Sequence, residues 1–300
     1  MIQAPFLHIG SHICILSPSG VVNPDFVWNA KDVLESWGLI VTIGKSVFAA
    51  NGRFAGTDEE RIADIQSAID DNNCDAILCS RGGYGLARII DKIDFSKLQE
   101  RPKWILGFSD ITLIHSALSL HGITSIHSIM TKNLALQAKE EPALRLKQLL
   151  FGELPSYSIG YERFNKKGTA LGNLVGGNLS VIYGLRGTAF DLQAKNNILF
   201  IEDVCEPLYH IDRMIQNIRL GGIFNQISGL VVGQFTDIQE DTSFPDGVYG
   251  IIENAVKDYS FPVCYGFNAG HTDYNLPLIL GHKTSLSVSD NGDSILTQNI

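Results

Sequence analysis

The sequence predicts an α/β protein of two domains: a parallel sheet with helices on both faces, followed by a β-rich α+β domain. Three observations carry this prediction. Strand and helix signals alternate through the first half, the pattern loosens between Lys139 and Lys167, and short strands predominate afterwards. The length of 300 residues agrees with two domains, because a single hydrophobic core seldom grows beyond roughly 250–300 residues.

In the first half, short apolar runs ending in turns with glycine or serine alternate with helical patterns. A helix should follow Thr57, which forms a capping-box pair with Glu60. This order is typical of parallel sheets, which bind ligands at the carboxyl ends of their strands. We expect strands at 13–16, 39–43, 76–79, 104–106 and 123–127, and further helices at 26–37 and 111–120.

In the second half, the apolar runs are shorter and more numerous, which favours a β-rich sheet with a few helices. We therefore divide the chain into a first domain at 1–140, a linker at 141–165 and a second domain at 166–300. The expected strands are 198–201, 229–232, 263–265, 276–280, 285–288 and 294–296, and the expected helices are 179–185, 211–218 and 249–256.

Composition and charge exclude several classes of protein. A hydrophobic fraction of 45% rules out long disorder, and no apolar run approaches a membrane span. The net charge of −9 argues against nucleic acid or an anionic membrane as the main partner. Residues 1–10 lack the cationic start of a signal peptide, and five cysteines without a CxxC pattern indicate reduced thiols. We expect a cytoplasmic protein that handles a small molecule.

A serine follows one of the predicted strands on a tight turn, in the run Gly107-Phe108-Ser109-Asp110. A serine there would be exposed at the carboxyl edge of the sheet, beside a helix N-terminus that can stabilise an oxyanion. The turn resembles a nucleophile elbow, although Ile111 replaces its second glycine. The alternative is that Ser109 only caps the following helix.

A glycine-rich turn, Arg81-Gly82-Gly83-Tyr84-Gly85, follows another predicted strand. Its glycines free the backbone to approach a ligand, but the spacing fits neither a dinucleotide fingerprint nor a Walker loop. A tight strand-to-helix turn with no ligand would have the same composition.

The second half contains a carboxylate at a strand end and a histidine in a glycine-flanked loop. Glu202 closes a predicted strand and could orient a histidine, with Glu206 as a rival. His271 follows Gly270 in a loop, where we expect a histidine to be more exposed than in a core. His127 ends a strand of the first domain. No spacing of His, Cys, Asp or Glu supports a metal site.

Taken in order along nearly the whole chain, these pieces resemble the LD-carboxypeptidase family of serine peptidases, whose relatives include muramoyltetrapeptide carboxypeptidases and microcin immunity peptidases. The resemblance lies in the segments 54–58, 75–85, 103–112, 172–179, 199–203, 209–214 and 270–271. One departure is His127-Ser128-Ile129, where relatives often have His-Gly-Pro, and it concerns the wall of the pocket.

The resemblance implies an N-terminal Rossmann-like domain that bears the nucleophile and a C-terminal domain that supplies a glutamate and a histidine. It implies Ser109 as the nucleophile, His271 as general base and then acid, and Glu202 orienting His271. The backbone N–H groups of Gly83 and Asp110 would form the oxyanion hole. Tyr84 and Asn178, which lie in the family-like segments, are predicted to belong to the substrate-binding site.

The implied activity is release of the terminal D-Ala from cytoplasmic muropeptide tetrapeptides during peptidoglycan recycling, without metal or organic cofactor and by a homodimer. The candidate cations for the substrate carboxylate are Arg81, Arg88 and Arg213.

Two alternatives stay open. The first is cleavage of aminoacyl- or peptidyl-nucleotide amides, which needs an aromatic platform. The tryptophans, Trp28, Trp37 and Trp104, are expected in the core or at a sheet edge and offer none. The second alternative is a binding protein without catalysis.

Overall fold

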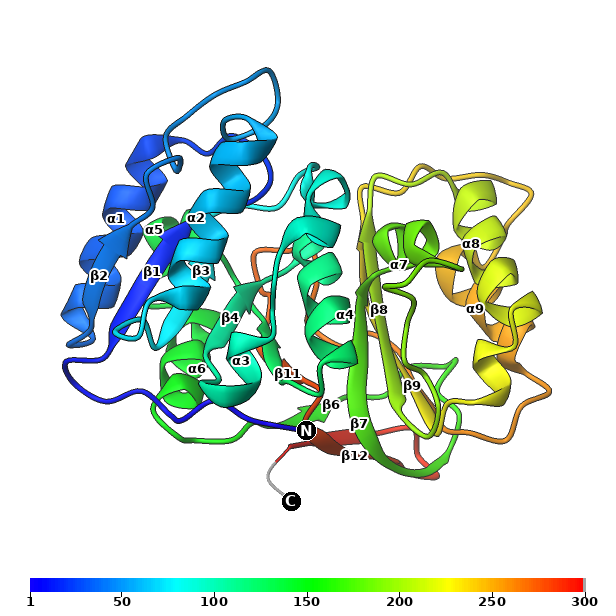
Figure 1. Cartoon of the computed structure of the whole chain (residues 1–300). Helices are drawn as coiled ribbons and strands as arrows, with labels where there is room; N and C mark the ends of the chain where they lie inside the picture. Colours follow the sequence, from blue (N-terminus) through cyan, green and yellow to red (C-terminus); the bar gives the residue numbers. More distant parts are fainter. Residues whose placement is uncertain (299–300) are drawn as a thin grey trace. The chain divides into compact units, whose positions relative to one another are not determined.

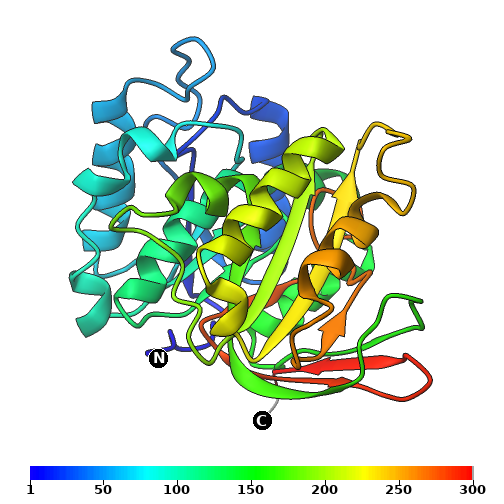
Figure 2. The same cartoon turned by 90° about the vertical axis from the view of Figure 1, so that its right-hand side faces the viewer.

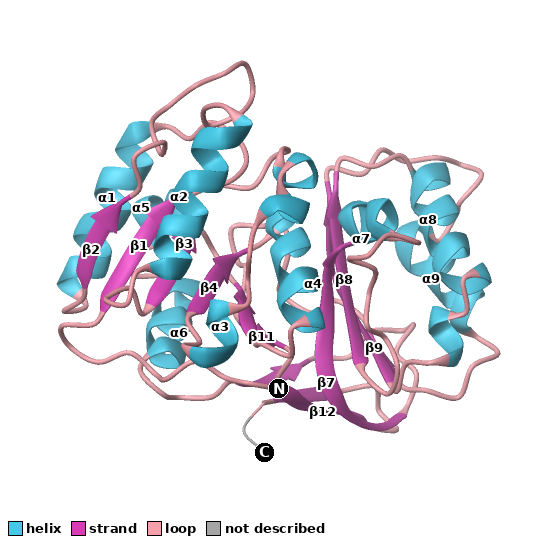
Figure 3. Ribbon diagram, in the orientation of Figure 1, coloured by secondary structure: helices cyan, strands magenta, loops and turns pink. Residues whose placement is uncertain are grey.

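The computed structural model describes residues 1–298 and divides the chain into two compact units. Unit 1 comprises residues 1–154 together with 273–281. Unit 2 comprises residues 155–272 together with the described residues from 282 onward. Each unit has its own sheet, and both mix helices with strands, so the predicted α/β class with a β-rich second part is confirmed (Figure 3).

Unit 1 is built on a six-stranded sheet with the order β11-β5-β4-β3-β1-β2. Five neighbouring strands are parallel, as the alternating pattern predicts, and β11 joins the edge strand β5 in antiparallel orientation. The strands are β1 (His12–Leu16), β2 (Ile40–Ile43), β3 (Ala76–Cys79), β4 (Trp104–Gly107), β5 (Ser125–His127) and β11 (Leu278–Leu280).

Helices cover both faces of this sheet (Figure 1). One face packs alternate strand residues such as Ile13 and Ile15 against helices α1, α5 and α6 in a continuous apolar core. The α-helices of the unit are α1 (Pro24–Ser36), α2 (Asp58–Asp70), α3 (Lys97–Glu100), α4 (Thr112–Leu120), α5 (Thr131–Gln137) and α6 (Glu141–Leu150). Three short 3₁₀ turns accompany them: η1 (Leu86–Arg88), η2 (Ile90–Lys92) and η3 (Ser109–Ile111).

Local sequence explains where the first two long helices begin. The Asn23 side chain accepts a hydrogen bond from the Asp25 N–H, and Pro24 occupies the first helical position of α1. Thr57 and Glu60 form the reciprocal capping box predicted for α2. These caps satisfy backbone donors that have no partner within their helices.

Unit 2 is built on a seven-stranded mixed sheet with the order β10-β9-β8-β7-β12-β13-β6. The long strand β7 (Gly168–Asn178) unites its two parts, because its first half pairs antiparallel with β12 and its second half parallel with β8. The other strands are β6 (Ser156–Ile159), β8 (Ile198–Val204), β9 (Gly229–Thr236), β10 (Val263–Cys264), β12 (Lys283–Val288) and β13 (Ser294–Thr297).

Three helices and one 3₁₀ turn pack against the parallel part of this sheet: α7 (Leu179–Leu185), α8 (Leu208–Leu220), α9 (Gly247–Val256) and η4 (Ile223–Asn225). Figure 2 shows α8 and α9 lying across β8 and β9. The apolar face of α8 buries Ile211, Met214, Ile215 and Ile218 in the core of the unit. Burial of each such side chain contributes about 1.5–3 kcal/mol to folding.

The boundaries between the units differ from those expected from composition. The stretch 141–165, predicted as a linker, contains α6 and β6, and the change of unit falls between Leu154 and Pro155. Residues 273–281 belong to unit 1, although they were expected in the second domain.

No helix within residues 1–298 is long and apolar enough to cross a membrane.

Candidate active site

Ser109 lies on a sharp turn between β4 and α4 in unit 1. Its φ of 65° is in the left-handed region, which costs a non-glycine residue about 1–3 kcal/mol. Strain of this kind persists where the surroundings impose it and is concentrated at functional sites. The backbone therefore has the strand–turn–helix course of a nucleophile elbow.

The incomplete elbow motif has a packing explanation. A Cβ on Gly107, which has φ 155°, would lie 2.9 Å from the side chain of Ile111 and 3.2 Å from Cys79 Cβ. Ile111 is fully buried, so its side chain occupies the space that the missing second glycine would leave open.

The N-cap positions are Phe108 for η3 and Ile111 for α4, and neither supplies a capping side chain. Ser109 therefore occupies the N-cap position of neither helical segment.

The glycine-rich turn after β3 meets the Ser109 turn at Gly82. A Cβ on Gly82 would lie 2.8 Å from Ser109 Cβ, 3.1 Å from Ser109 Oγ and 3.2 Å from the Asp110 backbone nitrogen. Only a residue without a side chain lets the two turns approach so closely. The backbone at position 83 has φ 104°, a conformation that also favours glycine. The Tyr84 side chain is exposed and lies beside the Phe54 ring.

The Glu202 and His271 side chains meet in unit 2, as their predicted roles require. His271 Nδ1 lies 2.7 Å from Glu202 Oε2, and the Glu202 side chain is fully buried. The pairing register of β8 with β9 shifts between Ile201 and Asp203, so Glu202 sits at an irregularity of the strand pairing. The strand-end carboxylate predicted from sequence thus lies inside a longer strand.

Two glycines make room for this pair. A Cβ on Gly270, which has φ 132°, would lie 2.9 Å from Glu202 Oε2. A Cβ on Gly233 of β9 would lie 3.2 Å from Glu202 Cβ and 2.5 Å from the Ala269 carbonyl oxygen. Sequence reasoning named Gly82 only as part of a flexible turn and did not consider Gly233, because the side chains that these glycines contact are distant in the chain.

Hydrogen bonds around the histidine fix its backbone and its tautomer. Thr236 Oγ1 donates to the His271 carbonyl oxygen at 3.0 Å. The carboxylate of Glu202 can only accept from Nδ1–H, which assigns the lone pair to Nε2 in the neutral ring. A ring in this state can take a proton from a hydroxyl at Nε2.

The charge around His271 favours its protonated form. Burial alone would lower the pKa of His271, but the hydrogen bond and charge of Glu202, aided by the charge of Asp203, raise it above its usual value. Burial also raises the pKa of Asp203 to about 6, with the Glu202 charge acting in the same direction. The geometry is that of a base held by a carboxylate that stabilises the imidazolium.

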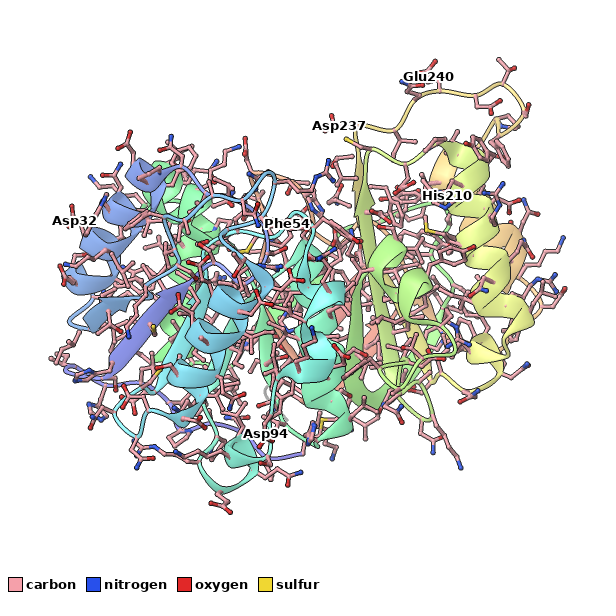
Figure 4. The ribbon with its side chains drawn as sticks, turned by 45° about the horizontal axis from the view of Figure 1, so that its top comes forward. Asp32, Phe54, Asp94, His210, Asp237 and Glu240 are labelled. Atoms are coloured by element: carbon pink, nitrogen blue, oxygen red, sulfur yellow. The ribbon has the colours of Figure 1, made fainter. Side chains whose placement is uncertain are left out.

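The rival carboxylate and the predicted substrate-binding asparagine have other partners. Glu206 pairs with His210 on α8 at 2.5 Å, so Glu202 is the carboxylate that contacts His271. Figure 4 labels His210 on α8 and shows Asp237 and Glu240 on the loop that follows β9. Asn178 is buried, caps α7 through the Val181 N–H and donates to Asp203 at 2.9 Å. These contacts give Asn178 a structural role in unit 2.

The candidate residues thus form two groups. Ser109, Gly83, Tyr84 and Asp110 belong to unit 1, and Glu202 and His271 belong to unit 2. Within residues 1–298, no three His, Cys, Asp or Glu side chains are grouped so that they could hold a metal ion. The chemistry available in these groups is that of a hydroxyl, an imidazole and a carboxylate.

Comparisons with known proteins identify the family. Residues 13–128 match the family model described as the LD-carboxypeptidase N-terminal domain, and residues 171–286 match the LD-carboxypeptidase C-terminal domain. The murein tetrapeptide carboxypeptidase of Pseudomonas aeruginosa is 30% identical over 283 residues, covering 89% of this chain and 90% of its own length.

Two solved structures are similar over almost their whole length. The muramoyltetrapeptide carboxypeptidase from Oxalobacter formigenes has a TM-score of 0.85 at 27% identity, over 95% of this chain and 98% of its own. The microcin C7 self immunity protein MccF has a TM-score of 0.89 at 18% identity, over 100% and 99%, and shows the fold alone. The chain belongs to the LD-carboxypeptidase family of serine peptidases.

Proposed function

We propose that this protein is a serine LD-carboxypeptidase that releases the terminal D-Ala from muropeptide tetrapeptides in the cytoplasm, during peptidoglycan recycling. The observation that carries the proposal is the 2.7 Å contact between His271 and the buried Glu202, in a chain of the LD-carboxypeptidase family. A buried carboxylate that orients an imidazole is the part of a serine peptidase that activates the hydroxyl.

In the proposed reaction, Ser109 Oγ attacks the carbonyl carbon of the third stem residue while His271 Nε2 takes the hydroxyl proton. The backbone N–H groups of Gly83 and Asp110 would stabilise the oxyanion. The C–N bond then breaks, and the proton on His271 passes to the amine of the departing D-Ala. Water, activated by the same histidine, hydrolyses the acyl-enzyme and restores Ser109.

A carboxypeptidase also needs a cation for the terminal carboxylate of its substrate, and Arg81 is our candidate. Its Nη1 donates to the Val21 carbonyl at 2.6 Å, and its Nε borders Gly20 and Gly83 at 3.9 Å from the Cβ that each lacks. The rivals have partners elsewhere: Arg88 binds Asp58 at 2.9 Å, and Arg213 stacks on Tyr209 in unit 2. Arg81 therefore presents charge at the glycine turn.

The test is D-Ala release from disaccharide tetrapeptide. We expect Ser109→Ala to lower kcat by at least about 10⁴-fold, because the remaining groups cannot replace the nucleophile. Arg81→Ala should raise KM far more than it lowers kcat, and Arg88→Ala is its matched control. Equal D-Ala release by wild type and Ser109→Ala would contradict the proposed mechanism.

Two further experiments separate the alternatives. Hydrolysis of an aminoacyl sulfamoyl adenosine with tetrapeptide untouched would favour a nucleotide-conjugate substrate, and a serine-hydrolase reagent that fails to label Ser109 would favour a binding protein.

The expectation that all tryptophans are core or edge residues needs one correction. Trp28 on α1 is 49% exposed and stacks on the Phe48 ring at 5.4 Å.

A further inference from the structure

We infer that the carboxylate of Asp110 is a positioning residue, which sets the distance between the two proposed oxyanion donors by joining the loops that follow β1, β3 and β4. The inference rests on the proposed function, since it assigns a purpose to the pocket beside Ser109. It differs from the predicted role of Asp110, which concerns only the backbone N–H of this residue.

The Asp110 side chain is only 4% exposed and has partners in two other loops. Its Oδ2 accepts a hydrogen bond from the Ser19 hydroxyl, in the loop after β1. The same oxygen accepts from the Leu86 backbone N–H at 3.0 Å, at the end of the glycine-rich turn after β3. A single oxygen on the loop after β4 thus holds the loops that follow β1 and β3.

The remaining pair of loops is joined directly. The Gly20 backbone N–H donates to the Gly82 carbonyl oxygen at 3.0 Å, which links the loop after β1 to the glycine-rich turn. Each of the three loops is therefore bonded to both others, and we call this closed set of contacts the loop brace (Ser19, Gly20, Gly82, Leu86 and Asp110). Because β1, β3 and β4 are adjacent in the sheet, the brace spans one contiguous edge.

A buried arginine strengthens the brace from α2. Arg61 is fully buried, and its Nη1 donates to the Pro18 carbonyl at 2.9 Å and to the Gly85 carbonyl at 3.1 Å. Its Nη2 pairs with Asp58, and its positive charge also reduces the cost of placing the Asp110 carboxylate in the same interior. Burial raises the pKa of Asp110, while the Ser19 and Leu86 hydrogen bonds and the Arg61 charge act in the opposite direction.

The brace matters for catalysis because the proposed donors lie on two different loops. Gly83 belongs to the turn after β3 and the Asp110 N–H to the loop after β4, and the two loops pack so tightly that Gly82 has no room for a Cβ. A displacement of about 1 Å in such a pocket can cost about 100-fold in rate. Without the carboxylate, the hydrogen bonds that Ser19 and Leu86 donate to the loop after β4 would be lost, and with them a direct restraint on the separation of the two donors.

The test compares steady-state kinetics of Asp110→Ala, Asp110→Asn and Ser19→Ala on the full chain. We expect Asp110→Ala to lower kcat about 100-fold with KM changed less than threefold. Asp110→Asn should recover at least fivefold of that loss, because its amide oxygen can accept the same two donors. Ser19→Ala, which removes one donor, should lie between wild type and Asp110→Ala.

The matched control is Asp64→Ala. Asp64 on α2 also accepts from a serine hydroxyl and a backbone N–H, at 2.7 and 2.6 Å from Ser46, but it holds the loop after β2 instead. A general loss of stability would affect both aspartate variants alike. A kcat of Asp110→Ala within twofold of Asp64→Ala would overturn the inference.

A second measurement does not depend on the substrate. Amide hydrogen exchange in segments 18–20 and 82–86 should accelerate in Asp110→Ala and not in Asp64→Ala, whatever reaction the protein performs. Unchanged exchange would overturn the brace, whereas faster exchange in a protein that releases no D-Ala would show that the proposed function alone had failed.

Discussion

Gly82 allows little change, because it packs directly against the Ser109 turn. The Cβ of an alanine there would fall within 3.2 Å of Ser109 Cβ, Ser109 Oγ and the Asp110 nitrogen. Gly82 does not have a positive φ, so an alanine is opposed by contact and not by backbone conformation. We expect Gly82→Ala to fold but to lose about 100- to 1000-fold in kcat, the cost of losing one oxyanion donor. The measurement is kcat on tetrapeptide.

The control for this substitution is Gly184→Ala. Gly184 also lacks a positive φ, and a Cβ there meets nothing within 4 Å. An alanine in α7 should leave kcat unchanged and stabilise the helix by up to about 1 kcal/mol. If both variants kept wild-type activity, the close approach of the two turns would have no catalytic meaning.

The Glu202–His271 pair predicts a specific change in pH dependence. His271 must be neutral to accept a proton, so activity should fall as the pH drops through its raised pKa. Glu202→Gln removes the charge that raises this pKa, so the acidic limb of kcat/KM should move to lower pH. The plateau should fall by about 10³–10⁴-fold, because the imidazolium loses its partner.

Glu206→Gln supplies the matched comparison, since Glu206 forms a second glutamate–histidine pair with His210. Its pH profile should match that of the wild type. A shift in the acidic limb for Glu206→Gln, with none for Glu202→Gln, would contradict the prediction. The orienting role would then belong to Glu206.

At the scale of elements, α4 is tied to the end of β4 through a buried histidine. His115 Nε2 lies 2.9 Å from the Gly107 carbonyl oxygen, and its Nδ1 lies 2.8 Å from Ser125 Oγ on β5. The carbonyl can only accept, so Nε2 carries the proton and Nδ1 accepts from the serine. The neutral ring thereby holds the strand end that precedes Ser109.

This histidine should make stability depend on pH. Burial lowers the pKa of His115 to about 4, below its unfolded value of about 6.5. The folded state therefore binds fewer protons, and the contribution is complete above pH 6.5 and lost as the pH falls toward 4. We expect His115→Gln to remove a pH-dependent difference of up to about 3 kcal/mol between pH 7.5 and pH 4. Urea unfolding at several pH values measures it.

His8→Gln is the control, because His8 is exposed near the N-terminus. Its unfolding free energy should follow the wild-type curve at every pH. An equal slope for wild type and His115→Gln between pH 6.5 and pH 4 would exclude His115 as the source of the dependence.

Local elements were predictable from sequence where local chemistry determines them. The capping box at Thr57 and the strand before Ser109 follow from residues that are close in the chain. The register shift at Glu202 could not be foreseen, because it depends on how β8 pairs with β9, about 30 residues away. Spacing favoured Glu202 over Glu206, and the contact with His271 agrees with that preference.

At the scale of the whole molecule, the chain is divided between its units in a way that composition does not indicate. It leaves unit 1 after Leu154, returns for residues 273–281 and then leaves again. The returning segment supplies β11, whose residues 278–280 are buried and pair with β5. An apolar run of three residues predicts a strand but carries no information about which sheet it joins.

The returning segment therefore predicts how unit 1 behaves when it is separated. A fragment of residues 1–154 leaves β5 as an uncovered edge strand with the apolar Ile126 on it, and His127 loses Asn275, whose Oδ1 lies 3.0 Å from His127 Nε2. Uncovered edges pair with other chains. We expect this fragment to aggregate, and the same fragment with residues 273–281 attached by a flexible linker to be a folded monomer.

Size-exclusion chromatography with light scattering distinguishes these outcomes, and urea unfolding measures the stability that β11 adds. The matched control attaches the same segment carrying Ile279→Asp, since Ile279 is fully buried and a carboxylate there lacks a partner on the apolar face. This control should aggregate like the bare fragment. If the bare fragment were instead monomeric and as stable as the fused one, β11 would be an accessory strand and the first 154 residues would suffice to fold the half that bears Ser109.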